Sequence, residues 1–530
     1  ASSPGFISDA VRQLLLTNTH RVRYTLKPSS TLNAEKADKE KARLENERAN
    51  MSDADIQALK DKAEALEARQ VQEDDPDILP KVGLEDIRPE LTYVAPTAER
   101  SDRIDTTEYV TGTNGIIYQQ AMLNLPPMTR EQMTWLPFYT QAWTEVGAGG
   151  NSYLTQQQRQ TEVLGSLTSY ASVKGDIEDC NRLSGYLVMT GKALGNRAEP
   201  FSDMLRETWK SADFSEEGRL KDLLNQARAR KEQGITGSGH ALAMSAAAAP
   251  INRTADLMNM LGGLPQAKRL KERTERISED GAGFVSEALK DINSLISKGP
   301  DSLLLVHDEQ NAAAHIAAAR KDWDNANHYR KNCIDWDLST GASYWMVDSQ
   351  VNFCAWAIPT VTLDHPDAAS LAVLGGVLRN GYLHTAIREK GGAYGAGASQ
   401  DSSLGCFKFF TYRDPRTEGS FDDFAKSLTW VSGRTNGDDL IEQSVLGIIG
   451  SLDRPGSPAG EAKQAFHMDK SGRTRAVRQL FRDRLLKVAW TDILQATEKY
   501  LVGQDGYKAV VAPRGTADIA SKLGLTIGEY

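Results

Sequence analysis

The feature that most constrains the fold is an order of strand and helix patterns that occurs twice along the chain. The first copy runs from an apolar strand at residues 116–126, through a helix, to a second strand that includes residues 170–172. The second copy runs from residues 351–359, through a helix, to residues 394–399. In both copies glycine interrupts the chain between the helix and the second strand. The repetition predicts an α+β fold with two homologous domains, each a sheet covered by helices.

A highly charged segment precedes the two copies. Between Thr31 and Asp75 the chain has 13 acidic and 8 basic residues. Two helical runs, at residues 34–50 and 53–72, have few apolar residues at helical spacing, and Ser52 between them is a suitable N-cap. This pattern predicts a helical hairpin with a narrow apolar seam that connects domains. Upstream of it, the alternation at residues 20–28 predicts a strand.

Composition excludes several classes of protein. The net charge is -9 and no basic stripe is present, so a nucleic-acid partner is not expected. No apolar run approaches the roughly 20 residues that span a bilayer, and the first residues lack the basic and apolar regions of a secretory signal. We expect a soluble chain, with no compartment indicated. Four widely spaced cysteines, expected as reduced core thiols, are Cys180, Cys333, Cys354 and Cys406.

The eight histidines do not form a common zinc motif. Neither His-x-x-Glu-His nor its inverse occurs, so no metal site is predicted in this chain. His307 and His315 are too far apart to be ligands on adjacent turns of one helix. They are expected to be surface or hydrogen-bonded histidines, and His365 fits the start of a helix.

Two glycine-rich stretches do not predict nucleotide binding. Residues 234–241 have the glycine spacing of a phosphate-binding loop, but His240 and Ala241 stand where lysine and Ser/Thr would hold phosphate and magnesium. Residues 147–152 lack the final glycine of a dinucleotide motif and follow a helix, so they are predicted to form a flexible loop.

The segment from Leu378 to Gly395 has the pattern of a helix end, a double glycine and the start of a strand. Glycine past a helix end supplies a left-handed C-cap, and basic residues favour the negative end of the helix dipole. The break places Arg388 on one side and Tyr394 on the other. Read from these residues alone, the pattern favours a capped helix followed by a buried strand tyrosine.

Residues 382–395, followed by residues 409–415, resemble the last domain of the presequence proteases, in the pitrilysin/insulinase family of zinc metallopeptidases. Residues 238–248 with 261–264, and the charged hairpin at 31–72, are also similar to that family and occur in its order. The resemblance implies the tail of a preceding domain at 1–30, a helical hairpin linker at 31–80, a third pitrilysin-like domain at 81–330 and a fourth at 331–530.

The resemblance also implies a function. Family members have two halves that close around a peptide, and the first half binds zinc through His-x-x-Glu-His. The second half contributes an arginine and a tyrosine that match Arg388 and Tyr394, which would stabilise the carbonyl oxygen during hydrolysis. The chain is thus expected to be the C-terminal half of a zinc-dependent oligopeptidase for unstructured peptides. Its partner would be an N-terminal zinc-bearing half, and the isolated chain would be inactive.

Two alternatives remain open at the level of sequence. The chain could be a non-catalytic subunit or peptide-binding paralogue of the same family, as in heterodimers where one subunit binds zinc. It could instead be a stand-alone interaction protein built on the duplicated fold. That second alternative leaves Arg388 and Tyr394 without a role.

Overall fold

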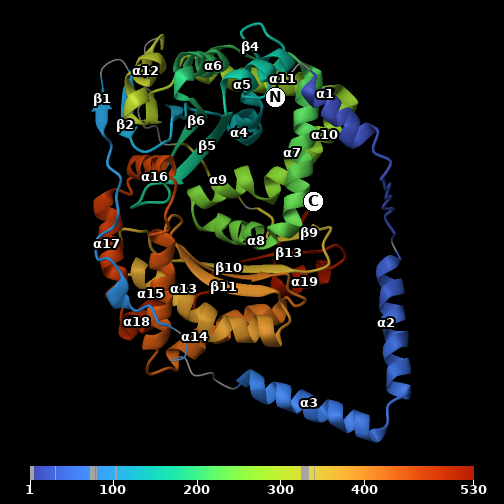
Figure 1. Ribbon diagram of the computed structural model, residues 1–530. Helices are drawn as coiled ribbons and strands as arrows, with labels where there is room; N and C mark the ends of the chain where they lie inside the picture. Colours follow the sequence, from blue (N-terminus) through green and yellow to red (C-terminus); the bar gives the residue numbers. More distant parts are fainter. Residues whose placement is uncertain are drawn as a thin grey trace. The chain divides into compact units, whose positions relative to one another are not determined.

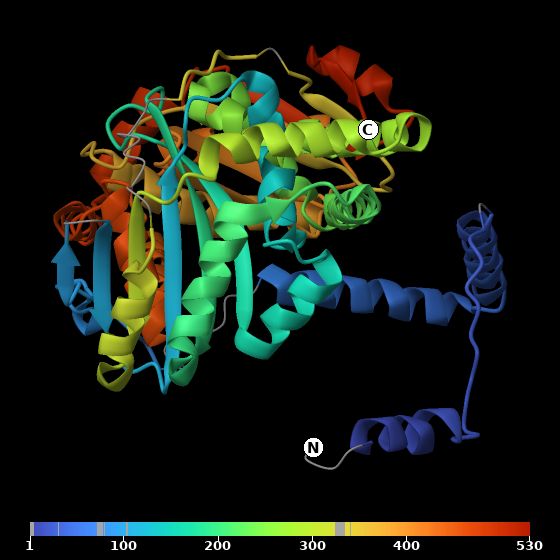
Figure 2. The same cartoon turned by 90° about the horizontal axis from the view of Figure 1, so that it is seen from above.

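The structure is a computed structural model, and the chain in it divides into two compact units, Ala1–Lys81 and Val82–Tyr530 (Figures 1 and 2). No described helix is both long enough and apolar enough to cross a membrane. The residues described are 5–29, 31–71, 78, 80–101, 104–323, 334–339 and 341–530.

The first unit contains the two predicted charged helices. Its helices are α1 (Phe6–Val11), η1 (Arg12–Leu16), α2 (Leu32–Ala49) and α3 (Asp53–Val71). The predicted N-cap of α3 is confirmed, because Asp55 N donates to Ser52 Oγ at 3.3 Å and Ser52 N donates to the Asp55 carboxylate at 2.9 Å. These reciprocal hydrogen bonds form a capping box.

The predicted strand at residues 20–28 is wrong. The structure describes this segment as neither helix nor strand, and it pairs with no other described strand. Alternation of side chains is not enough, because a strand needs a partner for its backbone N–H and C=O groups. The seam of the hairpin buries little surface, since the side chains of Leu44, Leu59 and Leu66 are all more than half exposed.

The second unit contains a first sheet of six strands in the order β1-β2-β8-β3-β6-β5. Only β2 and β8 are parallel, and the other neighbours are antiparallel. The strands are β1 (Ala98–Arg100), β2 (Asp105–Val110), β3 (Ile116–Asn124), β5 (Ser166–Gly175), β6 (Leu183–Leu194) and β8 (Ser302–His307).

The second sheet also has six strands, in the order β11-β12-β10-β13-β9-β14. Five strands repeat the chain order and directions of β2, β3, β5, β6 and β8, including a parallel pair, β9 and β13. The predicted duplication is thereby confirmed. The strands are β9 (Tyr344–Val347), β10 (Phe353–Pro359), β11 (Gly395–Asp401), β12 (Cys406–Tyr412), β13 (Tyr507–Pro513) and β14 (Ile527–Glu529).

Helices connect the strands in both halves of this unit. The first half has η3 (Leu84–Asp86), α4 (Arg130–Trp143), α5 (Tyr153–Val163), η4 (Gly195–Arg197), α6 (Ala198–Ser211), α7 (Glu217–Gly237), α8 (Gly239–Ala248), η5 (Ala249–Ile251), α9 (Arg253–Gly262), α10 (Leu264–Asp280), α11 (Gly283–Ile296) and α12 (Glu309–Arg320). The second half has α13 (Ala368–Leu378), η6 (Arg379–Lys390), α14 (Glu418–Ser432), α15 (Asp438–Leu452), α16 (Pro458–Lys470), α17 (Arg475–Leu485), α18 (Trp490–Tyr500) and α19 (Ala517–Leu523).

Each sheet is covered partly by a helix from the other half (Figure 1). On β10, Phe353 and Ala355 face α8, which belongs to the first half, whereas Cys354 and Trp356 face the helices of the second half. Side chains alternate along a strand, so both faces of β10 are buried and its sequence is almost continuously apolar. In return, α16 of the second half packs on the first sheet against β2, β3, β6 and β8.

The predicted flexible loop at residues 147–152 is wrong for its first part. Gly147–Ala148 forms a short strand, β4, that pairs with β7 (Ala212–Asp213). Gly149 and Gly150 then turn the chain with φ of 59° and 82°, which glycine adopts without strain.

The predicted domain boundaries remain a proposal. The strands of the two sheets lie within residues 98–307 and 344–529. Position 30, and the boundary between positions 330 and 331, fall outside the residues that the structure describes.

Candidate functional site

Arg388 and Tyr394 lie side by side at the turn between η6 and β11. The guanidinium carbon of Arg388 is 5.9 Å from the centroid of the Tyr394 ring. The side chain of Tyr394 is not in the core, since the residue is 66% exposed. The interpretation of a buried strand tyrosine is therefore wrong, and the two side chains can reach a ligand.

A tight turn brings the two residues together. η6 continues α13 and is π-helical, a geometry often found at functional sites. Gly392 follows with φ of 79°, the left-handed conformation expected of this double glycine. Gly392 N donates to Arg388 O at 3.2 Å, and Ala393 N donates to Ile387 O at 3.1 Å. These bonds satisfy carbonyls at the helix end and fix the direction in which Tyr394 leaves the turn.

The other glycine of the pair is required by close packing. A Cβ added at Gly391 would overlap Nη2 of Arg416. The same nitrogen donates to the Asp423 carboxylate at 3.0 Å, so the guanidinium is held in place on top of the turn. The predicted C-cap thus has two parts, a conformational one at Gly392 and a steric one at Gly391.

Three further side chains surround the tyrosine. The ring of Tyr412, on β12, meets Tyr394 edge-on with centroids 5.7 Å apart, and His240, on α8, meets Tyr412 at 5.0 Å. The guanidinium carbon of Arg413 is 5.3 Å from the Tyr412 ring centroid. Burial lowers the pKa of His240, which favours its neutral form. Sequence reasoning missed these three side chains as site residues, although they lie in stretches that carry the family resemblance.

Arg388 is available to an acceptor. Among the residues that the structure describes, no carboxylate forms an ion pair with its guanidinium. Its nearest polar neighbour is His384, whose Nε2 is 3.5 Å from Arg388 Nη1, and His384 Nδ1 is 3.4 Å from the Glu389 carboxylate. A guanidinium and a phenol therefore present hydrogen-bond donors to one region of the surface.

Two family descriptions match most of the chain. One, for the domain associated with M16 peptidases of subfamily C, matches residues 26–272, and the other, described as PreP C-terminal domain, matches residues 345–513. The chain is a presequence protease-like member of the pitrilysin family.

Known proteins agree with this membership. The chain is 25% identical over 534 residues to the mitochondrial presequence protease of Danio rerio, covering 95% of this chain and 51% of that protein. It is 24% identical over 541 residues to presequence protease 1, chloroplastic/mitochondrial, of Arabidopsis thaliana, covering 98% and 49%. The chain thus spans about half the length of these relatives.

A solved structure shares the fold. It is the peptidase M16 inactive domain from Pseudomonas fluorescens, with a TM-score of 0.52 and 14% identity, covering 78% of this chain and 96% of that one. At this level of identity the similarity shows the fold alone.

The described residues do not fit a zinc site. No three or more His, Cys, Asp or Glu side chains among them are placed to hold a metal ion. His307 and His315 do contact each other, with their Nδ1 atoms 3.0 Å apart, because the first ends β8 and the second lies on α12. His307 Nε2 lies 3.0 Å from the Glu108 carboxylate, so both of its nitrogens have partners.

The expectation of surface histidines is wrong for this pair, because both rings are buried. His307 is hydrogen-bonded as the alternative expectation had it. Burial lowers the pKa of His315 to about 3, with a further contribution from His307. His365 is confirmed at a helix start, since it accepts a hydrogen bond from Asp367 N at 3.1 Å just before α13.

Three of the four cysteines are confirmed as buried free thiols. They are Cys180, Cys354 and Cys406. Burial is the main cause that raises the pKa of each, which disfavours the reactive thiolate. Cys333 lies outside the described residues.

Two cavities lie along the edge strands of the two sheets. One of about 550 Å³ follows β5, and one of about 720 Å³ follows β11. Both are lined by Ser403 and Arg473, whereas Arg388 and Tyr394 line neither. The chain therefore has two distinct regions of interest, the exposed pair and the cavities at the sheet edges.

Proposed function

We propose that this chain is the C-terminal half of a zinc-dependent oligopeptidase that encloses and hydrolyses unstructured peptides. In this proposal Arg388 and Tyr394 bind the substrate and stabilise the oxyanion. An N-terminal half, on the same polypeptide or a separate subunit, carries the zinc.

The observation that supports this role most is the exposed pair of donors at the η6–β11 turn. Hydrolysis of an amide places negative charge on the carbonyl oxygen, and donors aimed at that oxygen lower the barrier. Tyr394 supplies an O–H group and Arg388 supplies charged N–H groups without an ionic partner among the described residues. The turn holds both by backbone hydrogen bonds, so little reorganisation is needed when charge develops.

Zinc belongs to the proposal through the family and not through these residues. Neither the sequence nor the described side chains offer a set of three ligands. When bound by the other half, zinc would supply the activated water and a Lewis acid. The residues of this chain would then act on the substrate from the opposite side of the peptide.

Apolar side chains in the first unit support the presence of a further half. Within residues 5–29 the large apolar side chains are exposed, and no side chain in α1 or η1 is buried. A soluble protein rarely leaves so many of these groups uncovered in one short segment. The exposed residues are Phe6, Ile7, Val11, Leu14, Leu15, Leu16, Val22, Tyr24 and Leu26.

The test is kinetic and uses the chain together with a zinc-bearing half, in one polypeptide or as a reconstituted pair. Tyr394→Phe should lower kcat by roughly 10²-fold, as for other losses of one oxyanion donor, with a smaller change in KM. Arg388→Ala should impair both kcat and KM, because a guanidinium also holds the ground-state peptide. Tyr507→Phe, at a partly exposed tyrosine on β13, is the matched control and should leave both parameters unchanged.

A Tyr394→Phe enzyme with normal folding and unchanged turnover would contradict the catalytic role. That result would favour the alternative of a non-catalytic subunit or peptide-binding paralogue. Turnover by the pair of halves, and none by either half alone, separates the two-half enzyme from a stand-alone interaction protein.

A further inference from the structure

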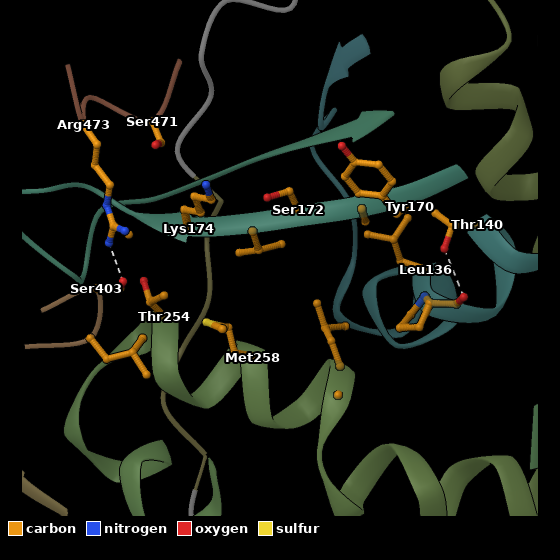
Figure 3. A pocket seen from close by; sticks show the side chains of 17 residues that line it. Leu136, Thr140, Tyr170, Ser172, Lys174, Thr254, Met258, Ser403, Ser471 and Arg473 are labelled. Atoms are coloured by element: carbon orange, nitrogen blue, oxygen red, sulfur yellow. Dashed lines mark hydrogen bonds between the residues drawn. The ribbon is translucent and has the colours of Figure 1, made fainter. Parts of the chain in front are cut away.

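The 550 Å³ cavity lies along the free edge of a sheet (Figure 3). β5 is the last strand of the first sheet and pairs only with β6. Residues 170–175 of β5 line the cavity. In the part of the chain that the structure describes, the backbone groups of residues 168–174 form hydrogen bonds only within the ladder to β6. An edge of this kind can accept another strand.

The cavity reaches both faces of this edge strand. Figure 3 shows Tyr170, Ser172 and Lys174 on one side of β5, and Met258 of α9 on the other. The second side is completed by apolar residues of α4 and α9, such as Leu136. Because side chains alternate along a strand, an added strand would direct every second side chain to the apolar side and the others to the polar side.

The polar side has two cations and no anion. Lys174 and Arg473 both line the cavity, and its lining includes no Asp or Glu. No carboxylate among the described residues pairs with either cation, although the Arg473 guanidinium donates to Ser403 Oγ (Figure 3). Burial and then the charge of Arg473 lower the pKa of Lys174. A negative group placed between these two side chains would relieve their repulsion.

A lysine on an edge strand can also serve to prevent aggregation. A lysine in that role projects into solvent. Lys174 is instead half-buried, and together with Arg473 it lies at one end of a cavity. Solubility alone does not account for the convergence of two cations from β5 and from the residues after α16.

We propose that the free edge of β5 is a docking site for an extended peptide that pairs with residues 170–174 and places a carboxylate between Lys174 and Arg473. The carboxylate is that of an Asp or Glu side chain or of the peptide's C-terminus. At about 3.3 Å per residue, this edge spans about five residues of the peptide. The site is separate from Arg388 and Tyr394, so it holds a part of the peptide that is not being cleaved.

Fluorescence anisotropy of the full chain tests the charge requirement without any turnover, so this proposal can fail independently of the proposed function. The probe is a fluorescein-labelled peptide of eight residues, alternating leucine and threonine and ending in two glutamates. Its control ends in two glutamines and a C-terminal amide. We expect the glutamate peptide to bind at least about tenfold more tightly, as charge-assisted hydrogen bonds would produce.

Variants locate the site. Lys174→Ala and Arg473→Ala should each weaken binding of the glutamate peptide about tenfold, and Lys174→Arg should restore it. Lys192→Ala, at an exposed lysine on the neighbouring strand β6, is the matched control and should bind normally. Equal affinity of the Lys174→Ala chain and the unaltered chain would overturn the proposal.

Peptide N-methylation tests strand pairing. An added strand directs the N–H groups of alternate residues only toward its partner. N-methyl groups on one alternate set of residues should therefore abolish binding, and those on the other set should leave it nearly unchanged. Equal binding of both methylated peptides would refute pairing with β5. Failure of all the peptides to bind would overturn peptide docking and leave this edge to another protein segment.

Discussion

His467 should make the stability of the second unit depend on pH. This residue lies on α16, the helix of the second half that packs on the first sheet. Its Nε2 is 2.8 Å from Gln120 Oε1 and its Nδ1 is 3.2 Å from the Tyr186 hydroxyl. The ring also stacks on Tyr186, with centroids 5.7 Å apart. In the neutral form one nitrogen donates to Gln120 and the other accepts from Tyr186, so both are satisfied.

Protonation of this ring is unfavourable in the folded chain. Burial lowers the pKa of His467 to about 4, and the positive charges of Lys174, Lys470 and Lys463 contribute in the same direction. In the unfolded chain the pKa returns to about 6.5. Below pH 6.5 the unfolded state therefore binds more protons, and stability is lost as the pH falls from 6.5 toward 4. Below pH 4 this residue causes no further loss.

The size of the effect follows from the two pKa values. The complete shift corresponds to about 3 kcal/mol, of which about 2 kcal/mol is lost between pH 7 and pH 5. Solvent reaches part of the ring, so we expect a measured loss of about 1 to 2 kcal/mol over this interval.

Urea unfolding followed by circular dichroism at pH 8, 7, 6 and 5 measures this loss. His467→Gln removes the titrating group, so its stability should fall by about 1 to 2 kcal/mol less than that of the unaltered chain between pH 7 and pH 5. The contribution of His315 is present in both proteins and cancels. Between pH 8 and pH 7 the two proteins should behave alike. Equal losses in both proteins between pH 7 and pH 5 would refute the reasoning.

Three other outcomes are expected. Deleting residues 31–72 and adding a short linker should move the Tm of the second unit by less than about 2 °C, since the seam of the hairpin is mostly exposed; loss of cooperative unfolding would contradict this. The purified chain, washed with chelator, should contain no stoichiometric zinc and cleave no peptide, whereas one zinc per chain with chelator-sensitive activity would show a site that we have missed. Gly391→Ala should destabilise the chain by about 1 to 3 kcal/mol, because its Cβ would displace Arg416 from Asp423. Gly419→Ala meets the same guanidinium at an ordinary 3.5 Å and is the control; equal stability of the two variants would refute the steric argument.

The sequence by itself determined most of the local structure. Ile116–Asn124, Phe353–Pro359 and Ser302–His307 are strands close to where apolar runs predicted them. The charged helices of the hairpin and the capping box at Ser52 follow from residues within one turn of each other. The duplication was also predictable, because the same order of elements is written twice along the chain.

Only the tertiary structure decided which elements cover which sheet. α8 packs on the second sheet and α16 on the first, and no local pattern marks a helix for a sheet of the other half. The same is true of the contact between His307 and His315, whose spacing was evaluated as though both were on one helix.

The candidate site divides in the same way. Arg388 and Tyr394 were found from sequence because a single turn places them together. Lys174 and Arg473 are far apart in the chain and converge on one cavity only after both halves have folded against each other. Periodicity and caps depend on neighbours along the chain and can be read from it. Contacts between distant elements depend on how whole faces pack, which a single sequence does not encode in any local pattern.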